Sequence, residues 1–309
     1  DGHGTALSDS ADPGGRHMLE LKGSIPALVT PFRDGSVDIE ALERLVEWHI
    51  AQGSDGLVAV GTTGESPTVS KIEHKDVIKR VVDLVAGRIP VVAGTGSNAT
   101  AQSLDMLQHA EAVGADAALV VTPYYNKPNQ AGLLSHYQVL HDNSAIPIIL
   151  YNIPGRCVID ILPETMAEMA RWPRIIGVKD ATGSMERVSK QRALCGKAFM
   201  QFSAEDAAAL GFNAHGGQGC ISVTANVAPG LCAEFQSASL AENLELAREY
   251  QDRLLPLHSA MFLEPPAACA KYGLSRLGLC HEDVRLPLTP VTEATRREID
   301  KAMEIAGLL

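Results

Sequence analysis

The feature that most constrains the fold is a series of eight short apolar runs, each followed by a turn and then by a stretch with helical periodicity. The runs are rich in Val, Ile, Leu and Ala and recur about every 20 to 30 residues, as βα units do. They cover residues 25–32, 56–63, 90–96, 117–125, 147–154, 175–182, 199–205 and 219–224. Most are apolar at consecutive positions, which indicates parallel strands buried on both faces. The pattern predicts an α/β protein with a (β/α)8 TIM barrel.

The sequence after the eighth run predicts helices and no further strand. Helix-like segments span 229–260, 264–277 and 292–307, with breaks at Pro256, Pro265 and Pro290. We therefore expect the barrel to occupy residues 18–228 and a C-terminal helical region to occupy 229–309. Residues 1–17 are polar and rich in Gly, Ser and Asp, so we interpret them as a disordered expression-tag remnant before a natural start at Met18.

A doubly wound parallel sheet is the alternative fold. It usually carries a glycine-rich phosphate loop after its first strand. The segment GTGSNA at 94–99 follows a predicted strand but lacks the third glycine in register. This departure favours the barrel.

Composition and charge exclude several classes of partner. The chain has 26 basic and 37 acidic residues and a formal net charge of -11, with no cluster of Lys, Arg and aromatic residues, so we expect no nucleic-acid partner. No apolar run approaches the roughly 18 residues of a membrane span. The six cysteines form no CxxC pair and the ten histidines no HExxH. We expect a cytoplasmic protein without a metal and without membrane attachment.

Candidate catalytic residues lie where the predicted strands end, because the active site of a (β/α)8 barrel is built at the carboxyl ends of its strands. These residues are Thr62, Thr63, Tyr124, Tyr125, Tyr151, Asn152, Arg156, Lys179, Glu205 and Asp206.

Lys179 is the most informative of these positions. It ends the apolar run IIGVK, so its amine is expected inside the barrel, where burial favours the neutral, nucleophilic form. The alternative is a structural lysine paired with Asp180 or with another carboxylate. Tyr151 ends the preceding run, and its phenol can relay protons beside the amine if the two strand registers agree. Alternatively, it is a core tyrosine.

Two further motifs have the chemistry of carboxylate binding. The hydroxyls and backbone N–H groups of Thr62 and Thr63 precede a predicted helix from Ser70 and can bind an anion, although a capped turn would look the same. Arg156 follows the run that ends in Tyr151, and its guanidinium suits bidentate binding of a carboxylate. It could also be a surface arginine on a loop.

Together these segments resemble the dihydrodipicolinate synthase family, whose superfamily also contains N-acetylneuraminate lyase. The resemblance covers nearly everything after Met18. It is carried by GTTGES, TPYYNKP, YNIPGR, GVKDATG and GCISVTANVAP in that order. It implies condensation of pyruvate with L-aspartate-4-semialdehyde in the diaminopimelate route to lysine. No cofactor is implied beyond a covalent pyruvate imine.

The resemblance also implies roles for individual residues. Lys179 would form the imine, and Tyr151, Thr62 and Tyr125 would relay protons, with Tyr125 supplied by a neighbouring subunit of a homotetramer built from tight dimers. Substrate would be bound by Thr63 at the pyruvate carboxylate, by Arg156 at the semialdehyde carboxylate, and near the carbonyl of Ile221.

The family's lysine-feedback pocket is matched only in part. Its matching positions are Ser66, His74, Asn98 and Tyr124. Lys71 stands where histidine is usual in the inhibited bacterial enzymes, and Gln102 stands where glutamate is usual. Because a carboxylate is lost and a cation gained, we expect weak or no inhibition by lysine.

Two other functions are compatible with these patterns. One is a pyruvate-dependent aldolase or lyase acting on a keto-sugar acid, although the sugar-acid lyases tend to carry an apolar residue at the position of Arg156. The other is a non-catalytic barrel that binds a keto acid or a partner protein.

Overall fold

Eight parallel strands form a closed barrel in the computed structural model, which describes residues 19–309. The strands are β1 (Gly23–Pro26), β4 (Leu57–Ala59), β5 (Val91–Gly94), β6 (Ala117–Val121), β7 (Ile148–Asn152), β8 (Ile175–Asp180), β9 (Met200–Ser203) and β10 (Gly219–Ser222). Their order is β1-β10-β9-β8-β7-β6-β5-β4, and a parallel bridge between Ala27 and Val58 closes the ring. The predicted (β/α)8 fold is confirmed. The expected tag remnant at 1–17 lies outside the described residues.

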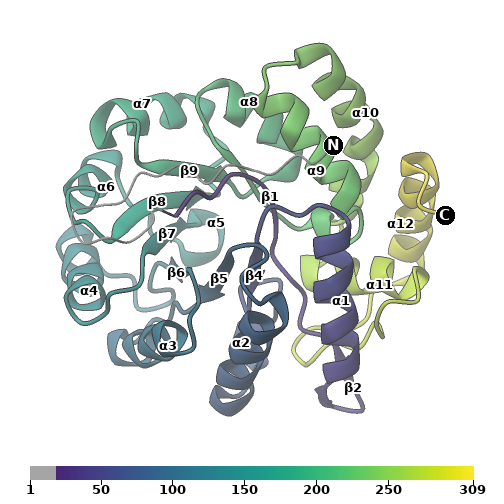
Figure 1. Ribbon diagram of the computed structural model, residues 1–309, viewed down its shortest axis with the longest axis horizontal. Helices are drawn as coiled ribbons and strands as arrows, with labels where there is room; N and C mark the ends of the chain where they lie inside the picture. Colours follow the sequence, from purple (N-terminus) through teal and green to yellow (C-terminus); the bar gives the residue numbers. More distant parts are fainter. Residues whose placement is uncertain (1–18) are drawn as a thin grey trace, which may run out of the picture.

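Helices surround the barrel on its outer face (Figure 1). They are α1 (Ile39–Ala51), α2 (Lys71–Val85), α3 (Thr100–Ala112), α4 (Gln130–Asp142), α6 (Pro163–Met169), α7 (Met185–Cys195), α8 (Ala209–Ala214) and α9 (Pro229–Leu240). The short helix α5 (Pro154–Cys157) instead follows the carboxyl end of β7, inside the ring of helices (Figure 1). The helix predicted from Ser70 is present as α2, with Ser70 as its N-cap. The Ser70 hydroxyl accepts from the N–H of Glu73, and the Glu73 carboxylate accepts from the N–H of Ser70, which forms a capping box.

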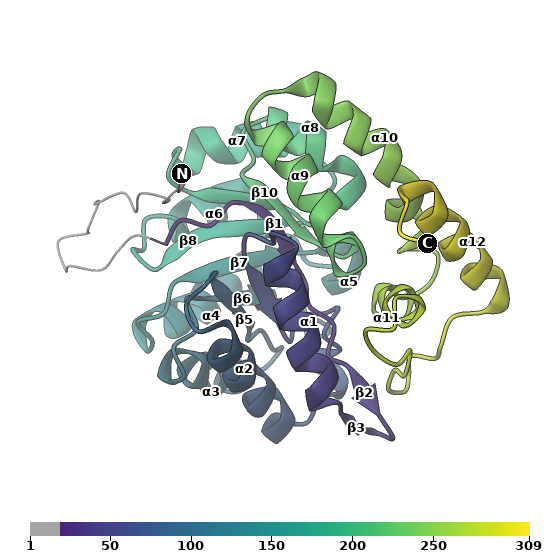
Figure 2. The same ribbon diagram turned by 45° about the vertical axis from the view of Figure 1, so that its right-hand side comes forward.

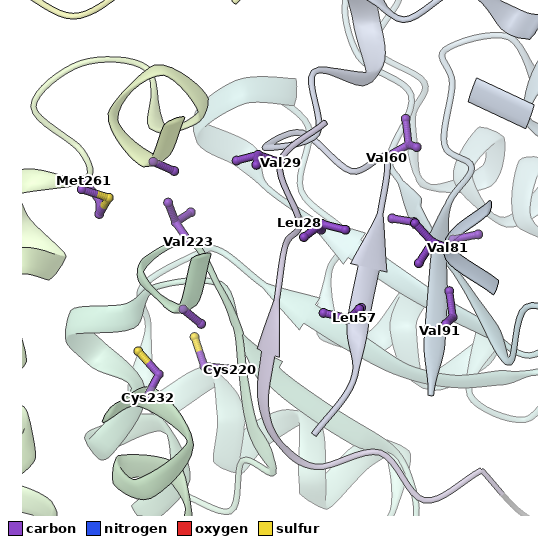
Figure 3. Close-up of a cluster of buried hydrophobic side chains, with 14 of the residues drawn as sticks. Leu28, Val29, Leu57, Val60, Val81, Val91, Cys220, Val223, Cys232 and Met261 are labelled. Atoms are coloured by element: carbon purple, nitrogen blue, oxygen red, sulfur yellow. The ribbon is translucent and has the colours of Figure 1, made fainter. Parts of the chain in front are cut away.

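Side chains alternate between two hydrophobic clusters along β4, β5, β6, β7, β8 and β10, which explains the continuous apolar runs. In β4, Val58 packs inside the barrel, whereas Leu57 and Ala59 pack against the helices. Figure 3 shows part of this outer cluster, including Val91 of β5 and Val81 of α2. Nearly all residues of the barrel strands are therefore buried, as expected for parallel strands covered by helices, and only Val121 and Ile176 are partly exposed.

Strands are shorter than the sequence predicted, and one small sheet was missed. The first strand covers Gly23–Pro26 instead of 25–32, and Phe32–Arg33 (β2) forms a hairpin with Ser36–Val37 (β3). The polar residues after β4 and β6 consequently lie in loops beyond the strand ends. The apolar run continues beyond the end of β4 because Val60 still packs in the outer cluster.

The C-terminal part is helical, as predicted, and α10 (Leu244–Ala260), α11 (Pro266–Arg276) and α12 (Glu293–Ala306) pack together outside the barrel on the side of α1 (Figure 2). The predicted break at Pro256 is wrong, because this residue lies inside α10. Leu254, Leu257 and His258 around it are buried, so packing of this face outweighs the backbone hydrogen bond that proline removes. The chain instead breaks after Leu240.

Candidate active site

Lys179 points into the barrel near its carboxyl end. Its neighbour Val178 belongs to the outer cluster, so alternation along β8 directs Lys179 inward, and only 6% of the residue is exposed. It pairs in register with Tyr151 of β7 on one side and Phe202 of β9 on the other. The Lys179 Nζ lies 4.2 Å from the centroid of the Tyr151 ring. The strand registers thus bring together the amine and the phenol that the sequence suggested as partners.

The carboxylate of Asp180 bonds to groups other than Lys179 and forms no ion pair with it. Its carboxylate accepts from the N–H of Thr182 at 2.8 Å, from the Thr182 hydroxyl at 2.6 Å and from the Gln191 amide at 3.2 Å. Arg187 lies 3.6 Å away as its cationic neighbour. Within residues 19–309 Lys179 has no ion pair with any carboxylate, and the alternative of a structural lysine paired with Asp180 is wrong.

The loop that carries Thr62 and Thr63 is a tight turn between two residues in left-handed backbone conformations, Val60 (φ 53°) and Glu65 (φ 56°). Thr63 is buried and Thr62 exposed. A Cβ at Gly64 would approach the Val60 Cα to 2.9 Å, so only glycine fits there without movement. The backbone N–H groups of Thr62 and Thr63 find no acceptor within residues 19–309 and remain available to an anion.

Arg156 and Glu205 bring one positive and one negative charge to the same rim. Arg156 is exposed on the short helix α5, and Glu205 lies two residues after the end of β9. Burial and the neighbouring Asp206 raise the pKa of Glu205, while the charges of Lys179 and Arg156 oppose that rise. Glu205 is thus a half-buried carboxylate near both cations. Its side chain accepts no hydrogen bond from another described residue.

Asp206 has a different position from Glu205, although the sequence grouped the two. It is buried and accepts from the hydroxyl of Ser222 and from the N–H groups of Val223 at 3.0 Å and Thr224 at 3.2 Å. These bonds fix the end of β10. Asp206 is therefore structural.

Ile221 and the two tyrosines lie at different levels of the mouth. Asp180 pairs with Ser203 and Ser203 with Cys220, so buried Ile221 stands one residue beyond that level. Tyr125 does not enter the barrel of its own chain, because 91% of it is exposed, on a residue with φ 71°. Tyr124 is 37% exposed.

The predicted feedback-pocket residues lie on a 3-10 turn (Ser66), on α2 (His74) and in the loops after β5 (Asn98) and β6 (Tyr124). The His74 ring is buried, and its Nε2 bonds to the carbonyl of Gly94 at 2.8 Å. The Asn98 carbonyl accepts from the Asn126 amide at 2.8 Å, and Ser66 is half-buried at the start of a 3-10 turn.

The two departures from the feedback pattern have partners of their own. Lys71 forms a 3.0 Å ion pair with Asp105, and Gln102 accepts from the Ser97 hydroxyl at 3.0 Å.

Sequence reasoning missed a buried ion pair between Glu65 and Lys271, whose side chains are 1% and 0% exposed. The signal was available, because Lys271 stands alone among small apolar residues in AACAKYGL and a buried cation needs a partner. The partner itself could not be predicted, since it lies 206 residues away.

No group of three or more His, Cys, Asp or Glu within residues 19–309 is arranged to hold a metal ion. In the same range no helix is both long and apolar enough to cross a bilayer.

Fold and site together define a (β/α)8-barrel enzyme with a buried, unpaired lysine amine at the mouth of the barrel. The model of the dihydrodipicolinate synthetase family matches residues 20–306. The chain belongs to this family, which confirms the resemblance seen in the sequence and makes the protein an enzyme of the lyase class.

Relatives agree over nearly the whole length. The 4-hydroxy-tetrahydrodipicolinate synthase of Cereibacter sphaeroides is 63% identical over 289 residues, which cover 94% of this chain and 100% of the relative. That of Brucella suis is 58% identical and covers 94% of this chain and 99% of its own. A dihydrodipicolinate synthase of Acinetobacter baumannii, solved in complex with pyruvate, superposes with a TM-score of 0.91 at 42% identity, covering 94% of this chain and 100% of that one.

Proposed function

We propose that this protein condenses pyruvate with L-aspartate-4-semialdehyde to 4-hydroxy-tetrahydrodipicolinate, through an imine between pyruvate and Lys179. The observation that carries the proposal is the environment of this lysine: it is 6% exposed, faces the Tyr151 ring at 4.2 Å and has no carboxylate partner within residues 19–309. An amine held at the mouth of the barrel beside a phenol is placed to attack the ketone of a small keto acid. The names of the 63% and 58% identical relatives support the choice of substrates.

The covalent steps follow from this amine. The Lys179 Nζ attacks C2 of pyruvate, and the carbinolamine loses water to give the imine. Loss of a methyl proton then gives an enamine, whose carbon attacks the aldehyde carbon of the second substrate. The amino group of that substrate finally attacks the imine carbon and releases Lys179, which closes the ring of the product.

Protons in these steps are moved by hydroxyl groups near the amine. Tyr151 acts as the donor beside the amine, since its ring centroid lies 4.2 Å from the Lys179 Nζ, and Thr62 extends the relay toward solvent. Thr63 and the unpaired N–H groups of its turn hold the pyruvate carboxylate. Arg156 holds the carboxylate of the semialdehyde, and the Ile221 carbonyl lies beside the bound substrates.

Tyr125 completes the relay from a second subunit. Its ring is 91% exposed and held outward by a left-handed backbone conformation, which suits insertion into a partner. We therefore include a homotetramer of tight dimers in the proposal. Light scattering tests the assembly, and Tyr125→Phe in the assembled protein should lower turnover without changing the mass.

Trapping with borohydride tests the proposal. Pyruvate and borohydride should inactivate the wild type and leave a reduced adduct on the peptide containing Lys179, with none on the peptide of the other buried lysine, Lys271. Lys179→Ala should show no adduct. An unmodified Lys179 peptide would instead support a non-catalytic barrel that binds a keto acid.

Product analysis with different aldehydes tests the second substrate. Aspartate semialdehyde should give the cyclic product, and Arg156→Ala should raise its KM. Preferred turnover of a sugar aldehyde would favour the keto-sugar acid lyase.

A further inference from the structure

A buried ion pair joins the C-terminal helical region to the loop between β4 and α2. The Lys271 ammonium, on α11, donates to the carboxylate of Glu65, the fifth residue of GTTGES. The two side chains are 0% and 1% exposed. None of the proposed chemical steps uses either group.

Both charged groups are fully satisfied inside the protein. The Lys271 Nζ also donates to the carbonyl of Asp283 at 2.8 Å and lies 3.9 Å from the centroid of the Phe32 ring. The second oxygen of Glu65 accepts from the N–H of Arg285 at 3.0 Å. Burial lowers the pKa of Lys271, and Glu65 opposes that shift.

A gain in the free energy of unfolding does not by itself explain why a buried ion pair stands here. The cost of removing two ions from water offsets most of their attraction, and apolar residues of similar volume are often as stable. What apolar residues cannot supply is a directional bond that fixes one carboxylate in one place. The pair therefore has its main effect on the geometry of the segment that carries Glu65.

This segment is the turn that carries Thr62 and Thr63. The N–H of Glu65 donates to the Thr62 carbonyl at 3.0 Å, and Glu65 itself holds the left-handed conformation that ends the turn. On the other side, the Thr30 hydroxyl donates to the carbonyl of Gly64 at 2.7 Å. A shift of the Glu65 carboxylate would thus move the threonines directly.

We propose that Lys271 and Glu65 are positioning residues: their ion pair holds the turn of Thr62 and Thr63 in the orientation that binds the keto-acid carboxylate. The inference rests on the proposed function and deepens it, because it makes the C-terminal helical region a part of the pyruvate site. Arg156 lies on α5, across the mouth, and is not connected to this pair.

The inference predicts a selective kinetic effect. Weakening the pair should raise the KM for pyruvate by about tenfold or more, because small misplacements of binding groups have large effects. The KM for the aldehyde should change by less than about threefold, since Arg156 is not displaced. A merely structural role would lower the amount of active enzyme and leave both KM values unchanged.

Three variants distinguish misplacement of the turn from a failure to fold. Glu65→Gln keeps the volume and removes the charge. The double variant Glu65→Leu with Lys271→Met replaces the pair by apolar side chains. Arg276→Ala is the matched control, because Arg276 lies on the same helix and pairs with Asp300 at the surface, at 2.8 Å.

The measurements are both KM values, kcat and the pyruvate concentration for half-maximal borohydride trapping. We expect Glu65→Gln and the double variant to need more pyruvate in both assays, while Arg276→Ala matches the wild type. A folded Glu65→Gln with the wild-type pyruvate dependence would overturn the inference, even if the double variant failed to fold. Absence of an adduct in the wild type would instead overturn the proposed function, and this inference with it.

Discussion

The two buried lysines of this protein have opposite electrostatic environments. Lys179 and Lys271 are 6% and 0% exposed, and each lies over an aromatic ring, at 4.2 Å from Tyr151 and 3.9 Å from Phe32. Only Lys271 has a carboxylate partner, Glu65. The Lys271 Nζ is held by Glu65 and by the carbonyl of Asp283, whereas the Lys179 Nζ at the barrel mouth has no such partner within residues 19–309 and can meet a substrate.

Exchange of either lysine for methionine should break this comparison most strongly. Lys179→Met should lower turnover on the order of 10⁴-fold or more, because the covalent route is lost. Its free energy of unfolding should be unchanged or higher, since an unpaired buried amine is replaced by an apolar group. Steady-state assays and urea unfolding check both. A large loss of stability would show that the amine has a structural partner.

Lys271→Met should show the reverse stability effect. It leaves the Glu65 carboxylate buried without its partner, and removal of one member of a buried pair costs about 3 to 5 kcal/mol. Urea unfolding measures the difference. The double variant with Glu65→Leu should recover most of the loss, and equal stability of the single variant and the wild type would contradict the assigned pair.

Buried imidazoles extend the comparison to groups that, like Lys179, form no ion pair within residues 19–309. Burial lowers the pKa of His49 to about 3 and that of His136 to about 4, from 6.5. Above pH 6.5 these imidazoles are neutral in both the folded and the unfolded chain, so burial of the neutral form contributes fully to stability. As the pH falls below 6.5, the unfolded chain binds protons that the folded protein does not bind, and the free energy of unfolding decreases. At pH 5 each of the two buried imidazoles should lower the free energy of unfolding by about 2 kcal/mol. Urea unfolding from pH 7.5 to 5 tests this, and His49→Gln should reduce the slope.

Removal of the Phe32 ring, which lies beneath Lys271, should have a smaller effect on stability. The Lys271 ammonium and the Arg285 guanidinium both lie over the Phe32 ring, at 3.9 and 4.2 Å from its centroid. Phe32→Leu keeps an apolar side chain but removes both cation–π contacts, so it should cost about 1 to 2 kcal/mol. Thermal unfolding measures it. Tyr151→Phe, which retains the ring beneath Lys179, should lose activity with little change in stability.

Addition of free L-lysine should have a smaller effect on the enzyme than any of these substitutions. Lys71 is already paired with Asp105, and no carboxylate stands at Gln102 to bind an added ammonium. We therefore expect weak or no inhibition in a steady-state assay, and low-micromolar inhibition would refute this. The double variant Lys71→His with Gln102→Glu should increase sensitivity, whereas Gln102→Asn should not.

Much of the fold and part of the site followed from local patterns. The eight apolar runs gave the strand number and type, and the ends of those runs included Lys179 and Tyr151, because strand periodicity fixes which side chains share a face. Strand ends and the course of α10 through Pro256 were not predictable to the residue, since packing with distant segments decides them.

By itself, the sequence determined the class of fold, the family and the lysine to examine first, because these depend on periodicity and motifs along the chain. Only the tertiary structure decided which charges are paired. Asp180, next in sequence to Lys179, is bound by Thr182, Gln191 and Arg187, while Glu65 meets Lys271 from 206 residues away. Charge pairing depends on distance in space and on exclusion of water, and neither is encoded by sequence separation.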